Sequence, residues 1–210
     1  GIPWPFKGLN TLTGGIHAGE LTICAARPGV GKTTIMVQCA EQVVQWMGET
    51  GATGAVKLVL CESSAEVFMR RWACLRSGVS MRRIQNGTVS DAQLEAFTRE
   101  LRTLARMPIE LLDNAQSLEE ITSFLGRGKT VWWALDYVQK CPLMPGRPND
   151  GGVGAITLLS GALTEVARQV APGLVLAHTP RDVDKREDRR PRLGDIKGGS
   201  ALEGDARVVL

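Results

Sequence analysis

A glycine-containing turn between an apolar stretch and an amphipathic one constrains the fold of this chain more than any other feature. Residues 26–34 read Ala-Arg-Pro-Gly-Val-Gly-Lys-Thr-Thr. The pattern G-x-x-x-x-G-K-[ST], typical of phosphate-binding loops, is met at Gly31, Lys32 and Thr33. Its first position is occupied by Ala26 instead of glycine.

The segments on either side of the turn provide the context that such a loop requires. Leu21–Ala25 is a short apolar run, which predicts a buried strand, and Thr33–Met47 carries an apolar stripe at helical spacing. Strand, loop and helix in this order place the loop at a helix N-terminus, where backbone N–H groups and the helix dipole favour an anion. A chance glycine turn is the weaker interpretation, because motif and context agree.

The chemistry of a nucleoside triphosphate explains these residue types. Its closely spaced charges call for many donors in a small volume, and a tight turn supplies backbone N–H groups. Gly29 and Gly31 permit conformations and a close approach that a Cβ would hinder. We expect Lys32 to reach the β- and γ-phosphates and the Thr33 hydroxyl to hold Mg²⁺, so the expected cofactors are ATP (or dTTP) and Mg²⁺. The predicted nucleotide-binding residues are Arg27, Pro28, Gly29, Val30, Gly31, Lys32, Thr33 and Thr34.

Strand-like and helix-like segments alternate along the rest of the chain. The apolar runs that predict strands are residues 56–61, 109–112, 130–135, 173–177 and 207–210. The segments that predict helices follow Ser63 or Ser64 to about Arg76, then cover 91–106, 118–125 and 155–170, with a short helix near Ala201. Such alternation favours an α/β fold with a mostly parallel, twisted sheet and helices on both faces, here as one domain over residues 1–210.

Composition fits a globular domain and limits few functions. Hydrophobic residues make up 43% and charged residues 22% of the 210 positions, and the net charge of +3 is too weak to indicate a nucleic-acid partner. Residues 181–192 are rich in both signs, which fits either a solvated loop or a phosphate-contacting loop. No signal peptide and no apolar run near about 18 residues is present, so we expect a cytoplasmic protein without a membrane partner.

Cysteine usage and the chain ends add two expectations. The five cysteines include no C-x-x-C pair, which fits a reducing compartment without a structural zinc site. The chain starts at Gly1 without Met and stops in a strand-like run at Leu210. We therefore expect a domain that is truncated at one or both ends.

Polar residues follow the predicted strands at Glu62, Asp113, Asp136 and His178. Ligands of parallel sheets bind at the carboxyl ends of the strands, which makes these positions candidates. Asp136 would be the second Mg²⁺ ligand of a nucleotide hydrolase, with a helix cap as the alternative. Glu62 could deprotonate the attacking water, although a lone Glu after a strand is more often a cap or a surface charge.

The histidine and the remaining aspartate have simpler alternatives. The ring of His178 could bond the γ-phosphate and report its loss to the adjoining loop, or it could be a satisfied structural histidine. Asp113 fits a structural role or a minor place in the site.

Several short segments, spread over nearly the whole chain, resemble motifs of the DnaB-type hexameric replicative helicases and occur in the same order. In that family Ala is usual at the first position of the phosphate-binding loop, as at Ala26. The matching segments are 13–21, which precedes the loop; 25–34, the loop itself; 60–64, similar to "L-E-x-S"; 135–139, similar to "I-D-Y-L-Q"; and 193–206, similar to "L-x-D-L-R-x-S-G-A-I-E-x-D-A". The resemblance implies a RecA-like NTP hydrolase that moves on single-stranded DNA, with Glu62 and Lys32 in catalysis and Thr33 and Asp136 on the metal.

Two departures refine the resemblance. The bacterial enzymes have Gln where this chain has His178, whereas phage helicase-primases and the mitochondrial Twinkle helicases have His, so the resemblance implies a phage-like variant with His178 as the γ-phosphate sensor. Lys197 stands where the family has an Arg that contacts the DNA backbone, which keeps the charge but loses the bidentate fork. Gly198 and Gly199 would let the loop backbone approach phosphates.

The resemblance also implies a partner for the site. In the hexameric rings an arginine finger from the neighbouring subunit completes each nucleotide site, and its equivalent lies beyond Leu210. Such a group typically contributes about 10³–10⁵ in rate. We therefore expect this polypeptide to bind nucleotide, to hydrolyse it slowly and to assemble poorly without the rest of a full-length homo-hexamer.

Two other functions remain open at this point. A RecA/RadA- or KaiC-like ATPase of recombination or regulation would share the fold, although the segment 193–206 favours the helicase. A non-catalytic NTP-binding module, for instance a loader or regulatory partner, is the other alternative, and the presence of the full set Lys32, Thr33, Glu62 and Asp136 argues against it.

Overall fold

The computed structural model describes residues 1–144, 152–179, 192–196 and 200–210, and its centre is a parallel sheet. Six strands pair in the order β3-β2-β4-β5-β1-β6, and each pairing is parallel. The strands are β1 (Leu21–Ala26), β2 (Ala55–Leu60), β3 (Ile109–Asp113), β4 (Thr130–Asp136), β5 (Gly173–His178) and β6 (Val208–Val209). The predicted α/β class is confirmed.

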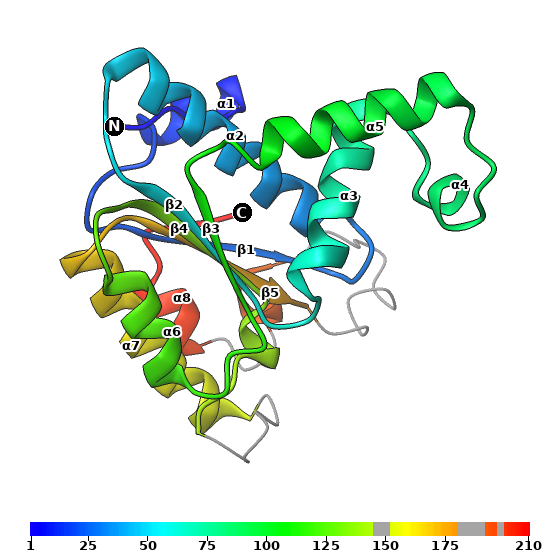
Figure 1. Cartoon of the computed structure of the whole chain (residues 1–210). Helices are drawn as coiled ribbons and strands as arrows, with labels where there is room; N and C mark the ends of the chain where they lie inside the picture. The colour runs from blue at the N-terminus through cyan, green and yellow to red at the C-terminus, as the bar shows by residue number, and fades with distance from the viewer. Residues whose placement is uncertain (145–151, 180–191, 197–199) are drawn as a thin grey trace.

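Helices cover both faces of the sheet, as Figure 1 shows. On one face lie α1 (Lys7–Thr13), α2 (Lys32–Thr50), α3 (Ala65–Ser77) and α5 (Asp91–Leu104), with α4 (Met81–Gln85) at the end of an extension next to α5. On the other face lie α6 (Leu118–Gly126), α7 (Val153–Gln169) and α8 (Ser200–Asp205). Two short 3₁₀ turns, Val138–Lys140 and Leu193–Asp195, follow β4 and precede α8.

Side chains of the central strands alternate between two hydrophobic cores because successive residues of a strand point to opposite faces. In β4, Trp132 packs with Met36 and Phe68 in the core under α2 and α3. Its neighbour Trp133 packs in the core under α6 and α7 together with Leu163. With both faces covered, the strands read as continuous apolar runs, which is why they were visible in the sequence.

The structure corrects several element boundaries. The first predicted helix begins at Lys32 and extends to Thr50, and the last strand covers only Val208–Val209. The residues Ser117-Leu118-Glu119-Glu120 have the sequence pattern of a capping box at the start of α6, but only half of it forms: the Ser117 hydroxyl accepts from the Glu120 N–H, whereas the Glu120 carboxylate accepts from the Gln116 N–H. Helices α1 and α4 were not predicted.

Within the described residues, no helix combines the length and apolar character needed to cross a membrane.

Candidate nucleotide-binding site

A pocket of about 350 Å³ opens at the carboxyl edge of the sheet. It lies where β1, β2, β4 and β5 end, which is where parallel sheets bind their ligands. Its lining combines the phosphate-binding loop with the polar strand ends: Pro28, Gly29, Gly31, Lys32, Thr33, Glu62, Arg71, Asp136 and His178. Residues from 28 to 178 in the sequence thus meet in one place.

The phosphate-binding loop needs glycine at two positions for its backbone. Gly29 has φ 80° and Gly31 has φ 114°, in the left-handed region that side chains other than glycine rarely adopt. A Cβ at either position would meet no atom within 4 Å, so conformation, not space within the chain, requires glycine. Helix α2 begins directly after Gly31, and its first residues, Lys32 and Thr33, line the pocket, so the first turn, whose N–H groups have no partner within a helix, lies at this edge.

Lys32 lies inside the loop that it follows. It is 6% exposed, and its Nζ donates to the carbonyl oxygens of Ala26 at 2.6 Å and Arg27 at 2.8 Å. Burial lowers the pKa of Lys32, while the charges of Asp136, Cys24 and Glu62 act in the opposite direction. The ammonium group therefore holds the turn in shape at the edge of the pocket.

Thr33 and Asp136 place two side-chain oxygens next to each other at the pocket. The Thr33 hydroxyl donates to Asp136 Oδ2 at 2.7 Å, although the two residues are 103 positions apart. Burial raises the pKa of Asp136; the hydrogen bond from Thr33 and the charges of Lys32 and Arg71 lower it, and Glu62 raises it further. A hydroxyl and a carboxylate side by side match the oxygen ligands that Mg²⁺ prefers.

Glu62 stands just past the end of β2, exposed at the pocket. The backbone N–H of Cys61 donates to the Asp136 carbonyl at 2.7 Å, which ties this strand end to that of β4. The neighbouring carboxylate, Asp113, has a structural role, because it accepts from the Ala65 N–H at 2.7 Å at the start of α3. Ser64 caps the same helix, so Glu62 is left facing the pocket.

His178 ends β5 and is held by two residues that were not predicted to belong to the site. Its ring stacks on that of Tyr137, with centroids 3.9 Å apart and ring planes 13° apart. Its backbone N–H donates to Gln139 Oε1 at 3.1 Å, and Gln139 Nε2 donates to its carbonyl at 3.4 Å. Both residues lie within the segment 135–139 that resembles a helicase motif, and this was the only sign of them in the sequence.

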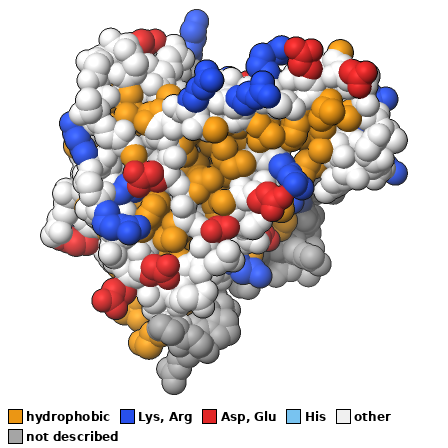
Figure 2. Space-filling view, in the orientation of Figure 1, with side chains coloured by type: hydrophobic (Ala, Val, Ile, Leu, Met, Phe, Trp, Pro, Cys, Tyr) orange, Lys and Arg blue, Asp and Glu red, His pale blue; other side chains and the backbone are white. Residues whose placement is uncertain are grey.

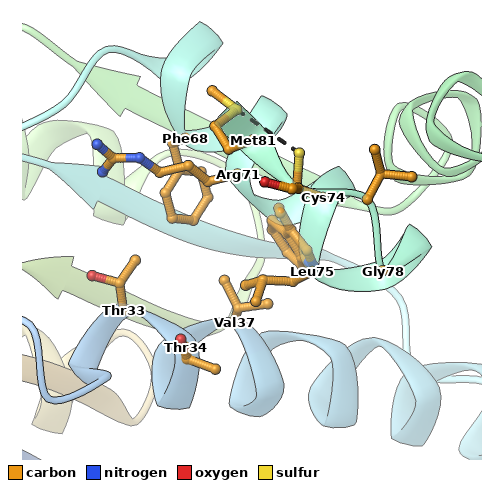
Figure 3. Close-up of a pocket in the computed structure, with 12 residues that line it drawn as sticks. Thr33, Thr34, Val37, Phe68, Arg71, Cys74, Leu75, Gly78 and Met81 are labelled. Atoms are coloured by element: carbon orange, nitrogen blue, oxygen red, sulfur yellow. Dashed lines mark hydrogen bonds between the residues drawn. The ribbon is translucent and has the colours of Figure 1, made fainter. Parts of the chain in front are cut away.

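Arg71 lines the pocket and was not predicted either. It lies on α3, is exposed, and also lines a second, more apolar pocket of about 560 Å³ between α2, α3 and α4. Figure 3 shows Arg71 on α3 across that pocket from Thr33 and Thr34 of α2. Figure 2 shows hydrophobic side chains gathered on the same side of the molecule, over the region of α3 and α5.

Three predicted nucleotide-binding residues of the same loop, Arg27, Val30 and Thr34, do not line this pocket themselves, and Thr34 lines the second pocket. Val30 is exposed at the tip of the loop. The predicted DNA-contacting residues 197–199 (Lys197, Gly198 and Gly199) lie outside the described residues, as do residues 181–191 of the charged segment.

Comparison with known proteins places this geometry in a family. The chain is 27% identical to the replicative DNA helicase DnaC of Bacillus subtilis and 29% identical to the replicative DNA helicase DnaB of Helicobacter pylori. These alignments cover the whole chain but 46% and 43% of the two helicases, so the chain spans about half the length of the curated relatives it matches.

Solved structures with a similar fold belong to the same kind of protein as the sequence relatives. A solved ATPase domain aligns over 99% of this chain and 74% of its own, with a TM-score of 0.81 and 25% identity. A DnaB-like replicative helicase, described with its interactions with primase, aligns over 99% of this chain and 50% of its own, also with a TM-score of 0.81 and 25% identity. The family model for the DnaB-like helicase C-terminal domain matches residues 1–210. This chain, with its RecA-like sheet and strand-end pocket, belongs to the DnaB-like helicase C-terminal domain family.

Proposed function

We propose that this chain is the NTP-hydrolysing motor domain of a replicative DNA helicase. It would hydrolyse ATP or dTTP with Mg²⁺ and couple hydrolysis to movement along single-stranded DNA. One observation carries the proposal: Lys32, Thr33, Glu62, Asp136 and His178 line a single pocket, in a chain that belongs to a helicase family.

The phosphate-binding loop would hold the triphosphate. The first turn of α2 lies at the pocket, and its N–H groups and the helix dipole favour the negative charge. Lys32 would exchange the carbonyls of Ala26 and Arg27 for β- and γ-phosphate oxygens. Since those carbonyls belong to the loop that borders the same pocket, the exchange needs only a small movement of the lysine side chain.

Thr33 and Asp136 would hold the Mg²⁺, Thr33 through its hydroxyl and Asp136 directly or through water. When bound, Mg²⁺ neutralises charge on the β- and γ-phosphate oxygens. The hydrogen bond between the two side chains, at 2.7 Å, already holds the Thr33 hydroxyl oxygen and the Asp136 carboxylate oxygen next to each other. Pairing with a cation would also remove the cost of keeping the Asp136 carboxylate charged in a buried place.

Glu62 would accept a proton from the water that attacks the γ-phosphorus. Its exposure at the pocket suits a group that must meet a solvent molecule. His178, on the neighbouring wall, would donate a hydrogen bond to the γ-phosphate and lose it after hydrolysis. This histidine supports the finer proposal that the chain is of the phage helicase-primase or Twinkle type.

The partners follow from the family and remain proposals. Single-stranded DNA would be contacted by Lys197, Gly198 and Gly199, and the full-length protein would form a homo-hexamer with an arginine finger supplied in trans. The match to the DnaB-like family over residues 1–210 favours this function over a recombination or regulatory ATPase. A non-catalytic nucleotide-binding role is disfavoured because Glu62 faces the pocket.

Strand displacement by the full-length protein on a forked duplex tests the proposal. Replacing Lys32→Ala should lower nucleotide affinity at least about 100-fold and abolish unwinding, because a buried charge-assisted phosphate contact is lost. Lys129→Ala is the matched control, since Lys129 is exposed near the amino ends of the strands, close to Thr53. Unwinding that survives in Lys32→Ala would refute the motor function.

A further inference from the structure

Two residues of one short segment contact His178, one at its ring and one at its backbone. The Tyr137 ring stacks on the His178 ring, with centroids 3.9 Å apart, and the Gln139 side-chain amide is hydrogen-bonded to both the N–H and the C=O of His178. Tyr137 and Gln139 are both buried, at 7% and 8% exposure. Buried polar groups are retained where their hydrogen bonds are satisfied, and Gln139 satisfies its amide on His178.

The Gln139 side chain forms the hydrogen bonds that a residue of β4 would form if the β4–β5 pairing continued as far as His178. The ladder between β4 and β5 ends at the pair Leu135–Val175, three residues before His178. On its other side β5 remains paired with β1 up to Ala26. The Gln139 side chain accepts from the N–H and donates to the C=O of His178, as a residue of a neighbouring strand would. The end of β5 is thereby fixed on the side of β4 as well.

Tyr137 fixes the orientation of the imidazole. Stacked aromatic rings resist rotation, because turning one ring gives up the contact over its face. The two nitrogens of a histidine donate and accept in the plane of the ring. With one ring face covered by Tyr137, the ring plane is set, and with it the directions in which those nitrogens can bond a phosphate.

We propose that Tyr137 and Gln139 are positioning residues for His178, and that they couple the phosphate-sensing histidine to the metal-binding strand end. This inference rests on the proposed function of His178. The segment Asp136–Gln139 carries the carboxylate bonded to Thr33 at one end and the amide bonded to His178 at the other. A shift of either group would therefore be passed along these four residues to the other, so that one short segment would respond to both the metal and the γ-phosphate.

A double-mutant cycle in the full-length protein tests the role of Tyr137 in turnover. Tyr137→Leu removes the ring and leaves a side chain of similar volume. The rate of DNA-stimulated ATP hydrolysis should fall about threefold to tenfold, the factor that corresponds to the interaction free energy of one aromatic pair. Tyr137→Phe keeps the ring and should restore most of that loss. In a His178→Ala background, Tyr137→Leu should have no further effect. An equal loss in both backgrounds would show that Tyr137 supports the fold generally and would overturn the proposal.

A spectroscopic measurement separates the positioning role from the sensor role. In protein labelled at histidine ¹³Cε1, stacking on Tyr137 shifts the His178 signal upfield, and the spectrum of His178→Gln identifies that signal. Tyr137→Leu and Gln139→Leu should each move it, whereas Tyr137→Phe should leave it close to its place. An unmoved signal in Tyr137→Leu would overturn the positioning role. A moved signal with turnover unchanged in His178→Ala would support positioning and reject the sensor function.

Discussion

In the amino half of the sheet, Lys57 and Thr130 are bonded to backbone carbonyls, whereas at the carboxyl edge Glu62, Asp136 and His178 line a pocket. Lys57 is 1% exposed and donates to the carbonyls of Phe124, at 2.7 Å, and Arg127. Thr130 donates to the Leu125 carbonyl at 2.6 Å. These carbonyls belong to the end of α6, where a helix leaves its acceptors unpaired, and a cation there also offsets the helix dipole.

The carboxyl edge follows the opposite rule. Glu62 is exposed, burial raises the pKa of Asp136, and Lys32 is bonded to carbonyls of its own loop. Under the proposed function, a bound cation would pair with Asp136 and bound phosphates with Lys32. The polar groups of the amino half would then serve stability and those of the pocket would serve binding, so changes at the two ends should separate in experiments.

The largest separation is expected for Glu62→Gln. Losing the base should lower the rate of DNA-stimulated ATP hydrolysis by the full-length protein by about 10²–10⁴-fold, the range typical of general-base catalysis. Nucleotide affinity and melting temperature should change little, since Gln has the same shape and position 62 is exposed. The matched control is Glu66→Gln in α3, whose carboxylate pairs with Arg70 on the surface. Unchanged hydrolysis in Glu62→Gln would remove Glu62 from catalysis.

Gly173→Ala should have the opposite profile, a loss of stability without a loss in catalysis. A Cβ at position 173 would lie 2.2 Å from Cζ2 of Trp133, whose indole is fully buried and donates to the Ala171 carbonyl at 2.7 Å. Overpacking of this kind costs about 1–3 kcal/mol of unfolding free energy.

Thermal or denaturant unfolding measures the cost, and Gly161→Ala serves as control. A Cβ at Gly161 on α7 meets no atom within 4 Å, and alanine favours a helix by about 0.5–1 kcal/mol over glycine. Equal stability of the two variants would contradict the tight fit between Gly173 and Trp133.

The two ends also differ in how much the sequence could predict. Residues 26–34 and the apolar strands were visible because the pattern itself carries the physics: glycine for positive φ, and continuous apolar runs for strands covered on both faces. Helix α1 was not visible, since it contains Gly8 and buries no residue, and Asn10 anchors it by two 2.8 Å hydrogen bonds with the Trp4 backbone. The five residues of α4 are too few to show a period.

Arg71 illustrates why part of the site escaped prediction. In the sequence it stands beside Arg70, and both look like surface residues of one helix. The fold separates them: Arg70 pairs with Glu66 at 2.6 Å, while the packing of α3 beside α2 puts Arg71 at the nucleotide pocket. Tyr137 and Gln139 were hidden for the same reason, because their contacts with His178 cross between strands.

Arg71→Ala should therefore weaken nucleotide binding, and Arg70→Ala should not. The charge of Arg71 opposes the rise in the pKa of Asp136, so its electric field reaches that carboxylate. Because the guanidinium is exposed and screened by solvent, we expect only about a threefold to tenfold loss in affinity for ATP. The loss for ADP should be smaller if the contact is to the γ-phosphate. Titration of both variants with fluorescent nucleotides measures the difference, and equal affinities would place Arg71 outside the site.

The smallest expected effect concerns the free energy of unfolding and how it depends on the ionisation of Asp136. Burial raises the pKa of Asp136 in the folded chain, with a further rise from Glu62, against the Thr33 hydrogen bond and the charges of Lys32 and Arg71. The folded state thus holds this proton more tightly than the unfolded state. The resulting stabilisation is present below the unfolded pKa and is lost as the pH rises through the raised folded value. Above that folded value the charged, metal-free carboxylate costs the folded state free energy.

Asp136→Asn should consequently melt slightly higher than the parent protein at pH 7.5 in EDTA. A gain of about 2–4 °C corresponds to 1 kcal/mol in a chain of this size. The gain should shrink as the pH falls and the parent carboxylate takes up its proton. Adding Mg²⁺ and nucleotide should reverse the order, because binding stabilises only a protein that still holds the metal. If Asp136→Asn melted lower at neutral pH without metal, Asp136 would be a stabilising residue, and the carboxyl edge would not differ from the amino half.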